Sequence, residues 1–202
     1  MLPLTRRRQG YPPARPPDWT RAFGRRVPLE VDLGCGRGHF ALERARAAPG
    51  IGLVAIDTRF KWIADIREQV RRMELTNLRA IRCDASRDLP LLFGPGAVRG
   101  FSLMHPDPWW KKRHRKRRLV RSEWIDQIAG MLEPGGWFYA QTDVPQLGEE
   151  IAGVLADNER FDPVDAEALL AERLGGAQSH RGRRCARLGI PVTRLAFVLS
   201  GD

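Results

Sequence analysis

Leu29-Glu30-Val31-Asp32-Leu33-Gly34-Cys35-Gly36-Arg37-Gly38 is the stretch of the sequence that predicts the fold. Its first five residues are rich in apolar side chains and predict a short strand, and the glycines after them predict a tight turn. A helical pattern then runs from the turn to about Ala48. A strand, a glycine turn and a helix in this order form the first half of a βαβ unit, so we expect a parallel sheet.

The alternation of strands and helices continues along the rest of the chain. Further strands are expected at 51–56, 78–83, 98–104, 137–141 and 193–200, and further helices at 60–73, 119–132 and 146–158. Residues 161–176 give no clear pattern, and 178–187 is predicted to be a basic loop. The alternation predicts an α/β fold with an open, mostly parallel, twisted sheet of about seven strands and helices on both faces.

Length and composition favour one globular domain. The chain has 202 residues, 43% of them hydrophobic, which is enough for a substantial core. We place this domain at 27–202. Residues 1–26 mix prolines and arginines without apolar periodicity and are predicted to be a mobile basic arm, with Trp19 and Phe23 anchoring its end.

The charge balance indicates a partner rich in phosphate. Lys and Arg total 34 against 24 acids, a formal net charge of +10, which suits nucleic acid or an anionic membrane surface. No apolar run approaches the roughly 20 residues that span a bilayer, and the start of the sequence lacks a signal-peptide core. We therefore expect a cytoplasmic protein without a membrane segment. The 3 cysteines are widely spaced and predict reduced thiols rather than a metal site.

Polar groups follow each of the first five predicted strands. These groups are Gly34–Gly38, Asp57, Asp84, Pro106-Asp107-Pro108 and Thr142-Asp143. The carboxyl ends of parallel strands lie along one edge of a sheet, where ligands bind in such folds. We therefore expect one site along that edge.

The loop after the fourth strand joins a rigid acid to a run of cations. Two prolines flank Asp107 and hold it in a stiff loop, because each fixes its own φ and restricts the residue before it. Lys111 to Arg118 is cationic at every position except His114. The run is interpreted either as a phosphate-binding segment or as a solvated face or localisation tag.

The glycine spacing distinguishes between cofactors. Dinucleotide-binding turns follow G-x-G-x-x-G, whereas His39 stands where that spacing needs a glycine, which disfavours a nicotinamide oxidoreductase. The pattern Asp32-x-Gly34-x-Gly36-x-Gly38 instead resembles the first motif of S-adenosylmethionine-dependent methyltransferases. An acid before the glycines suits a cofactor with an ammonium and a sulfonium. Asp57 is then placed to accept from ribose hydroxyls and Asp84 from an adenine amino group.

The loop sequence carries a more specific resemblance. Pro106-Asp107-Pro108-Trp109-x-Lys111-Lys112-Arg113-His114-x-Lys116-Arg117-Arg118 is similar to the signature of the bacterial tRNA (guanine-N7) methyltransferase family. The resemblance implies a Rossmann-like class I methyltransferase fold that transfers a methyl group from S-adenosylmethionine to N7 of a guanine in tRNA, releasing S-adenosylhomocysteine. We expect a monomer or homodimer. The 4 histidines do not share metal-ligand spacing with the cysteines, so we expect no metal.

Carried over by position, the resemblance also assigns site residues. Asp107 is the catalytic acid and also a cofactor contact. The other cofactor contacts are Asp32, Gly34, Gly36, Gly38, Asp57 and Asp84. Substrate contacts are Lys111, Asp143 and Ser179, and the cations that bind tRNA phosphates are Arg113, Lys116, Arg117 and Arg118.

The sequence departs from the family at a carboxy-terminal Thr-x-x-Glu motif. Ser179-His180-Arg181-Gly182 stands at those positions, so the hydroxyl is kept and the carboxylate is lost. Two alternatives follow. One is a diverged methyltransferase acting on another RNA or a small acceptor, and the other is a non-catalytic RNA-binding relative. The retained acids speak against the second alternative, because a pure RNA binder has no use for them.

Overall fold

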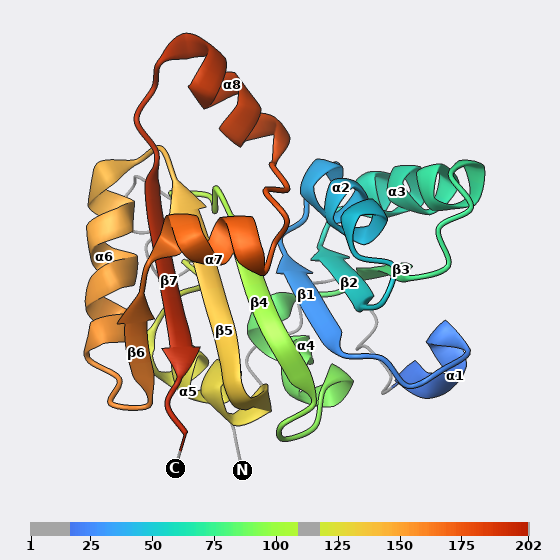
Figure 1. Cartoon of the computed structure of the whole chain (residues 1–202), viewed down its shortest axis with the longest axis horizontal. Coiled ribbons are helices and arrows are strands. Elements are labelled where there is room, and N and C mark those ends of the chain that lie inside the picture. Colours follow the sequence, from blue (N-terminus) through green and yellow to red (C-terminus); the bar gives the residue numbers. More distant parts are fainter. Residues whose placement is uncertain (1–16, 109–117, 202) are drawn as a thin grey trace.

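One sheet of seven strands forms the centre of the computed structural model, which describes residues 17–108 and 118–201. The strands are β1 (Leu29–Leu33), β2 (Gly52–Asp57), β3 (Leu78–Arg82), β4 (Val98–Met104), β5 (Leu132–Thr142), β6 (Phe161–Val164) and β7 (Thr193–Leu199). Their order is β3-β2-β1-β4-β5-β7-β6 (Figure 1). The strands from β3 to β5 are parallel, and β7 runs antiparallel to both of its neighbours.

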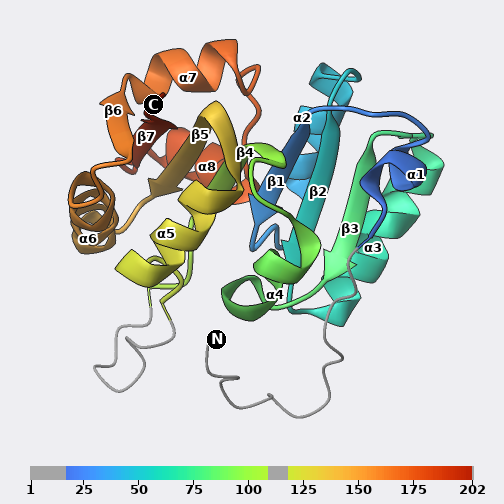
Figure 2. The ribbon, with the colours of Figure 1, turned by 90° about the horizontal axis from the view of Figure 1, so that it is seen from below.

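Helices cover both faces of the sheet. They are α1 (Trp19–Phe23), α2 (His39–Ala47), α3 (Phe60–Arg72), α4 (Ala85–Leu92), α5 (Ser122–Met131), α6 (Pro145–Ala156), α7 (Ala166–Glu172) and α8 (His180–Leu188). The apolar sides of α4, α5 and α6 pack on one face, and those of α2, α3 and α7 pack on the other (Figure 2). Every residue of β1 and β2 is buried, as expected for strands covered on both faces. The predicted α/β architecture is confirmed.

The segment before β1 packs against the domain through α1. The Trp19 ring stacks on Phe93 with 5.3 Å between ring centroids, and its Nε1 donates a hydrogen bond to the Leu92 carbonyl at 2.9 Å. The expected anchoring at this point is therefore present, and packing begins on the amino-terminal side of residue 27. The remainder of the predicted arm, residues 1–16, lies outside the described residues.

The prediction of a basic loop at 178–187 is wrong, because these residues form most of α8. The helix begins where Ser179 Oγ accepts a hydrogen bond from the Gly182 N–H at 3.0 Å, and it ends at Gly189 with φ of 63°. It buries Cys185 and exposes most of its other side chains, so it has no apolar stripe for a sequence pattern to detect. Sequence periodicity also gave no indication of α4, β6 or α7.

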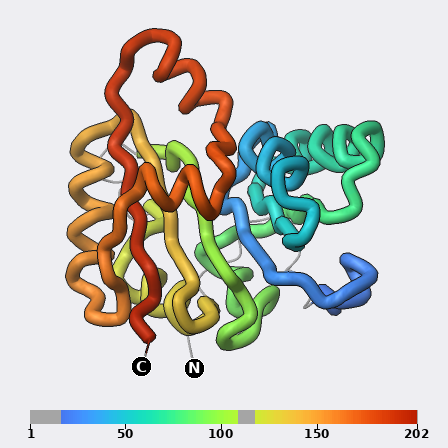
Figure 3. The backbone as a smooth tube through the Cα atoms, in the orientation of Figure 1, coloured from blue at the N-terminus to red at the C-terminus, as the bar shows by residue number. Residues whose placement is uncertain are grey.

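The excursion that carries α8 lies beyond the carboxyl ends of the parallel strands (Figure 1). In the backbone trace the chain leaves α7, rises above the sheet through α8 and returns downward as β7 (Figure 3). The edge that sequence analysis identified as the site is therefore approached from above by a helix that is rich in arginine.

Candidate active site

The glycine turn after β1 depends on glycine at three positions. Gly34, Gly36 and Gly38 have φ of 65°, 55° and 76°, the left-handed region that other residues rarely adopt. A Cβ at Gly38 would also lie 2.6 Å from Ile66 Cγ1 of α3. The Cys35 N–H anchors the turn by donating to the Ile56 carbonyl at 2.9 Å.

Asp57, at the end of β2, holds the glycine turn. Its Oδ2 accepts a hydrogen bond from the Gly36 N–H at 3.0 Å, and its Oδ1 accepts from the Arg59 N–H at 2.8 Å. Burial raises the pKa of Asp57, and these two hydrogen bonds oppose that rise. The carboxylate therefore links the ends of β1 and β2 at the edge of the sheet.

Asp32 is a buried acid without a partner. The residue is 1% exposed, and neither carboxylate oxygen accepts a hydrogen bond from any residue in the described part of the chain. Its neighbours in register are Ala55 on β2 and Ser102 on β4. Burial, followed by repulsion from Asp57, raises the pKa of Asp32 well above its ordinary value. Such a group gains most from a ligand that brings a cationic donor.

Asp84 lies two residues after β3 and caps α4. Its Oδ1 accepts hydrogen bonds from the N–H and the hydroxyl of Ser86 at 3.1 and 2.6 Å, at the start of α4. The sequence did not indicate Asp88, which is fully buried and accepts a hydrogen bond from the Asp84 N–H at 2.8 Å. Asp88 thereby fixes the position of the Asp84 backbone.

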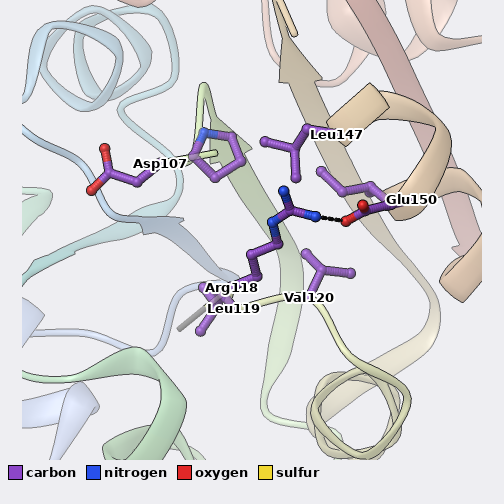
Figure 4. Close-up of a pocket in the computed structure, with 8 residues that line it drawn as sticks. Asp107, Arg118, Leu119, Val120, Leu147 and Glu150 are labelled. Atoms are coloured by element: carbon purple, nitrogen blue, oxygen red, sulfur yellow. Dashed lines mark hydrogen bonds and ion pairs between the residues drawn. The ribbon is translucent and has the colours of Figure 1, made fainter. Parts of the chain in front are cut away.

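Asp107 is exposed at the end of β4. Within its loop, Arg118 Nε donates to the Pro108 carbonyl at 2.9 Å, and the Arg118 guanidinium forms an ion pair with Glu150 of α6. Figure 4 shows Arg118 directed toward Glu150 while the Asp107 carboxylate extends away from that pair. Arg118 therefore braces the two ends of the loop. The cations Lys111, Arg113, Lys116 and Arg117 lie outside the described residues.

Asp143, after β5, is held from two sides. Its Oδ1 lies 2.9 Å from Nδ1 of His105, and its Oδ2 accepts from Arg181 of α8, with Nε at 3.1 Å. The hydrogen bond from Arg181, with a further one from His105, lowers the pKa of Asp143 to about 2. Asp143 is therefore ionised and joins the end of β5 to α8.

Two residues of this cluster were not expected to contribute to the site. His105 lies at the end of β4, and Gln141 lies two residues before Asp143 on β5. The Gln141 amide contacts both the His105 ring, at 3.0 Å, and the Ser179 hydroxyl, at 3.4 Å. Each residue lies two positions before a predicted site residue, but neither belongs to a motif that would single it out.

The predicted residues divide into two groups along one edge. The glycine turn, Asp32, Asp57 and Asp84 lie at or after the ends of β1, β2 and β3. Asp107 and Asp143 follow β4 and β5, and Asp143 contacts Arg181 of α8. A buried unpaired carboxylate behind an open backbone turn fits the ammonium end of an amino-acid-bearing cofactor. Across residues 17–108 and 118–201, no three His, Cys, Asp or Glu side chains are grouped to hold a metal ion. In the same residues no helix is long and apolar enough to cross a membrane.

The fold is a Rossmann-like class I methyltransferase fold. It is defined by the strand order, in which the antiparallel β7 lies between β5 and β6, and by the polar edge of the sheet. A solved 16S rRNA methyltransferase, KamB, superposes with a TM-score of 0.67 over 93% of this chain and 95% of its own, at 22% identity. That similarity concerns the fold alone.

Sequence comparison gives the family. Residues 26–195 match the family model described as putative methyltransferase. The tRNA (guanine-N(7)-)-methyltransferase of Myxococcus xanthus is 35% identical over 179 residues, covering 89% of this chain and 87% of the relative. The corresponding protein of Nostoc sp. is 32% identical over 189 residues, covering 92% and 86%. The chain belongs to the tRNA (guanine-N(7)-)-methyltransferase family, which confirms the resemblance seen in the loop sequence.

Proposed function

We propose that this protein transfers a methyl group from S-adenosylmethionine to N7 of a guanine in tRNA, in the cytoplasm. The observation that carries the proposal is the unpartnered Asp32 carboxylate behind the glycine turn, on the same sheet edge as Asp107. The activity named for the relatives supports the same reaction.

The cofactor is assigned to the ends of β1, β2 and β3. Asp32 would hold its ammonium, the backbone of the glycine turn would hold its amino-acid part, and Asp57 would accept from its ribose hydroxyls. Asp84, whose hydrogen bonds from Ser86 both go to Oδ1, would accept from its adenine amino group. Bound in this way, S-adenosylmethionine supplies an electrophilic methyl group.

Guanine N7 carries a lone pair, so no proton has to leave before it attacks the methyl carbon. The protein has to hold N7 in line with the bond that breaks and to stabilise the positive charge that arrives on the purine. Asp107 suits this task because flanking prolines hold its backbone and its carboxylate is exposed at the site edge. Asp143 and Ser179 are assigned to the substrate, and the cations of 111–117 to RNA phosphates.

A second candidate function is methyl transfer to another RNA or to a small acceptor. The observation that favours it is Gly182, where the family motif has a glutamate. A Cβ built there would lie 3.0 Å from Gln141 Nε2 and 3.3 Å from Ser179 Oγ. A side chain at this position would therefore require the Gln141 amide to shift by a few tenths of an ångström, and in this protein no carboxylate at 182 contributes to base recognition.

Transfer of labelled methyl groups to tRNA that lacks the modification tests the proposal, with the modified guanine mapped by chemical cleavage at 7-methylguanine. We expect Asp107→Ala to lose transfer while calorimetry still detects cofactor binding. Asp157→Ala, which removes an exposed acid at the end of α6, is the matched control and should retain activity. Cofactor binding by the native protein without transfer to tRNA would contradict the proposal, and unchanged turnover in Asp107→Ala would contradict the catalytic assignment.

A further inference from the structure

His105 has an unusual backbone at the point where β4 gives way to the Asp107 loop. Its φ is 52°, in the left-handed region, and its N–H donates a hydrogen bond to the Gln141 carbonyl at 2.8 Å. A non-glycine residue in this conformation is strained and persists where surrounding contacts hold it. Pro106 and Asp107 follow immediately, so whatever holds His105 also sets where the Asp107 loop begins.

The His105 ring is held at both nitrogens, which fixes its tautomer. Nδ1 lies 2.9 Å from Asp143 Oδ1, and an ionised carboxylate can only accept, so Nδ1 carries the proton. Nε2 then accepts from the Gln141 amide nitrogen at 3.0 Å. The Tyr139 hydroxyl, which contacts Gln141 Oε1 at 3.3 Å, fixes the orientation of that amide. One hydrogen-bonded chain therefore runs from the interior of β5 through His105 to Asp143.

Gly182 lies against the hydrogen-bonded side chains of Gln141 and His105. A Cβ at this position would lie 3.0 Å from Gln141 Nε2 and 3.6 Å from His105 Nε2. Any side chain at 182 would therefore press on the amide that orients the imidazole.

We infer that His105 is a positioning residue for methyl transfer, which aims the Asp143 carboxylate and fixes the start of the Asp107 loop through its hydrogen bonds to β5. The inference rests on the proposed function. His105 directs Oδ1 of Asp143, and Arg181 of α8 directs Oδ2. Because the ends of β4 and β5 and the start of α8 meet at this ring, a small rotation of the imidazole would move both assigned acids together.

The charged groups around the ring also give it a pH dependence. Asp143 faces it from β5, Arg181 from α8 and Arg194 from β7. Burial, together with the two arginines, outweighs the attraction of Asp143 and lowers the pKa of His105 below the ordinary histidine value. Protonation would place an N–H at Nε2 opposite the Gln141 N–H, so we expect turnover to fall on the acid side of that pKa.

Two variants separate positioning from packing. His105→Phe keeps a ring of similar size and removes both hydrogen bonds, whereas His105→Asn keeps an N–H donor near the Nδ1 position and tolerates a positive φ. We expect His105→Phe to lower kcat by about 10- to 100-fold with cofactor affinity unchanged, and to lack the acid limb of the native pH profile. His105→Asn should recover most of kcat. Native-like kcat in folded His105→Phe, or equal loss in both variants, would overturn the inference.

A measurement independent of activity completes the test. Imidazole nitrogen chemical shifts of the native protein should report the Nδ1–H tautomer at His105, and Gly182→Ala should perturb those shifts. A native Nε2–H tautomer would overturn the inference. If the native protein shows the expected tautomer but does not methylate tRNA, the proposed function fails and the assignment of the ring geometry stands, so the two failures are distinguishable.

Discussion

Replacing Asp32 with asparagine should stabilise the protein without cofactor and remove its response to cofactor. The native carboxylate is buried, and no described residue donates a hydrogen bond to it. Leaving a buried polar group unsatisfied costs about 1–3 kcal/mol, and more when the group is charged. Asparagine removes the charge but keeps a polar group, so we expect a net gain of about 1 kcal/mol. In a domain of this size that gain raises Tm by about 2–4 °C.

The dependence of this gain on pH follows from the direction of the pKa shift. Burial and Asp57 raise the pKa of Asp32 in the folded protein, so the folded state holds its proton more tightly than the unfolded state, whose pKa is about 3.9. The native protein therefore loses stability as pH rises from about 4 through the folded pKa. Because asparagine does not titrate, the difference in Tm between variant and native protein should widen across this interval.

Thermal melts of both proteins, with and without S-adenosylmethionine, measure both effects. At about 100 times Kd the ligand adds about 2.7 kcal/mol to the native protein, which is about 5–10 °C. We expect the asparagine variant to show almost none of this increase. An asparagine variant that melts below the native protein at neutral pH, or that keeps the full response to cofactor, would refute the reasoning.

Two further predictions concern the charged residues. Arg44 is buried in an ion pair with Glu30, with Nε and Nη2 at 2.8 and 2.7 Å from its oxygens, so Arg44→Met should leave a buried charge unpaired and cost about 3–5 kcal/mol. Differential scanning calorimetry should show Tm lower by about 6–20 °C, and the double variant that also carries Glu30→Gln should recover part of the loss. Alanine at both 116 and 117 should reduce the slope of log affinity for tRNA against log salt by about 1–2, and an unchanged slope would show that these cations do not contact phosphate.

The sequence predicted the parallel half of the fold well because most residues of those strands are apolar and glycine turns or acids follow them. β1 and β2 are buried at every position and end in recognisable polar groups, so strand, turn and acid could all be placed by pattern. α8 could not be placed in this way, because it buries only Cys185 and so presents no apolar face, although Ser179 and Gly189 cap its ends.

Sequence pattern located the acids of the candidate site but not the contacts that hold them. Asp57 and Asp84 were identified as strand-end acids, yet their hydrogen bonds to Gly36 and Ser86 depend on backbone geometry that a sequence does not display. The contact between His105 and Gln141 joins residues 36 positions apart and depends on the orientation of an imidazole. Only three-dimensional packing could reveal that this pair takes the space beside residue 182.

The position of β7 in the sheet has a consequence for synthesis on the ribosome. β7 is the last strand to emerge, yet it lies between β5 and β6 and pairs with β5 from Trp137 to Thr142. Until residue 199 has left the exit tunnel, the edge of β5, which is rich in aromatic residues, stays unpaired and is a template for aggregation. A translation product that stops before residue 193 would keep every residue assigned to the cofactor. It would still lack β7, the strand that joins β6 to β5. We expect such products to depend on chaperones and to be cleared by proteases.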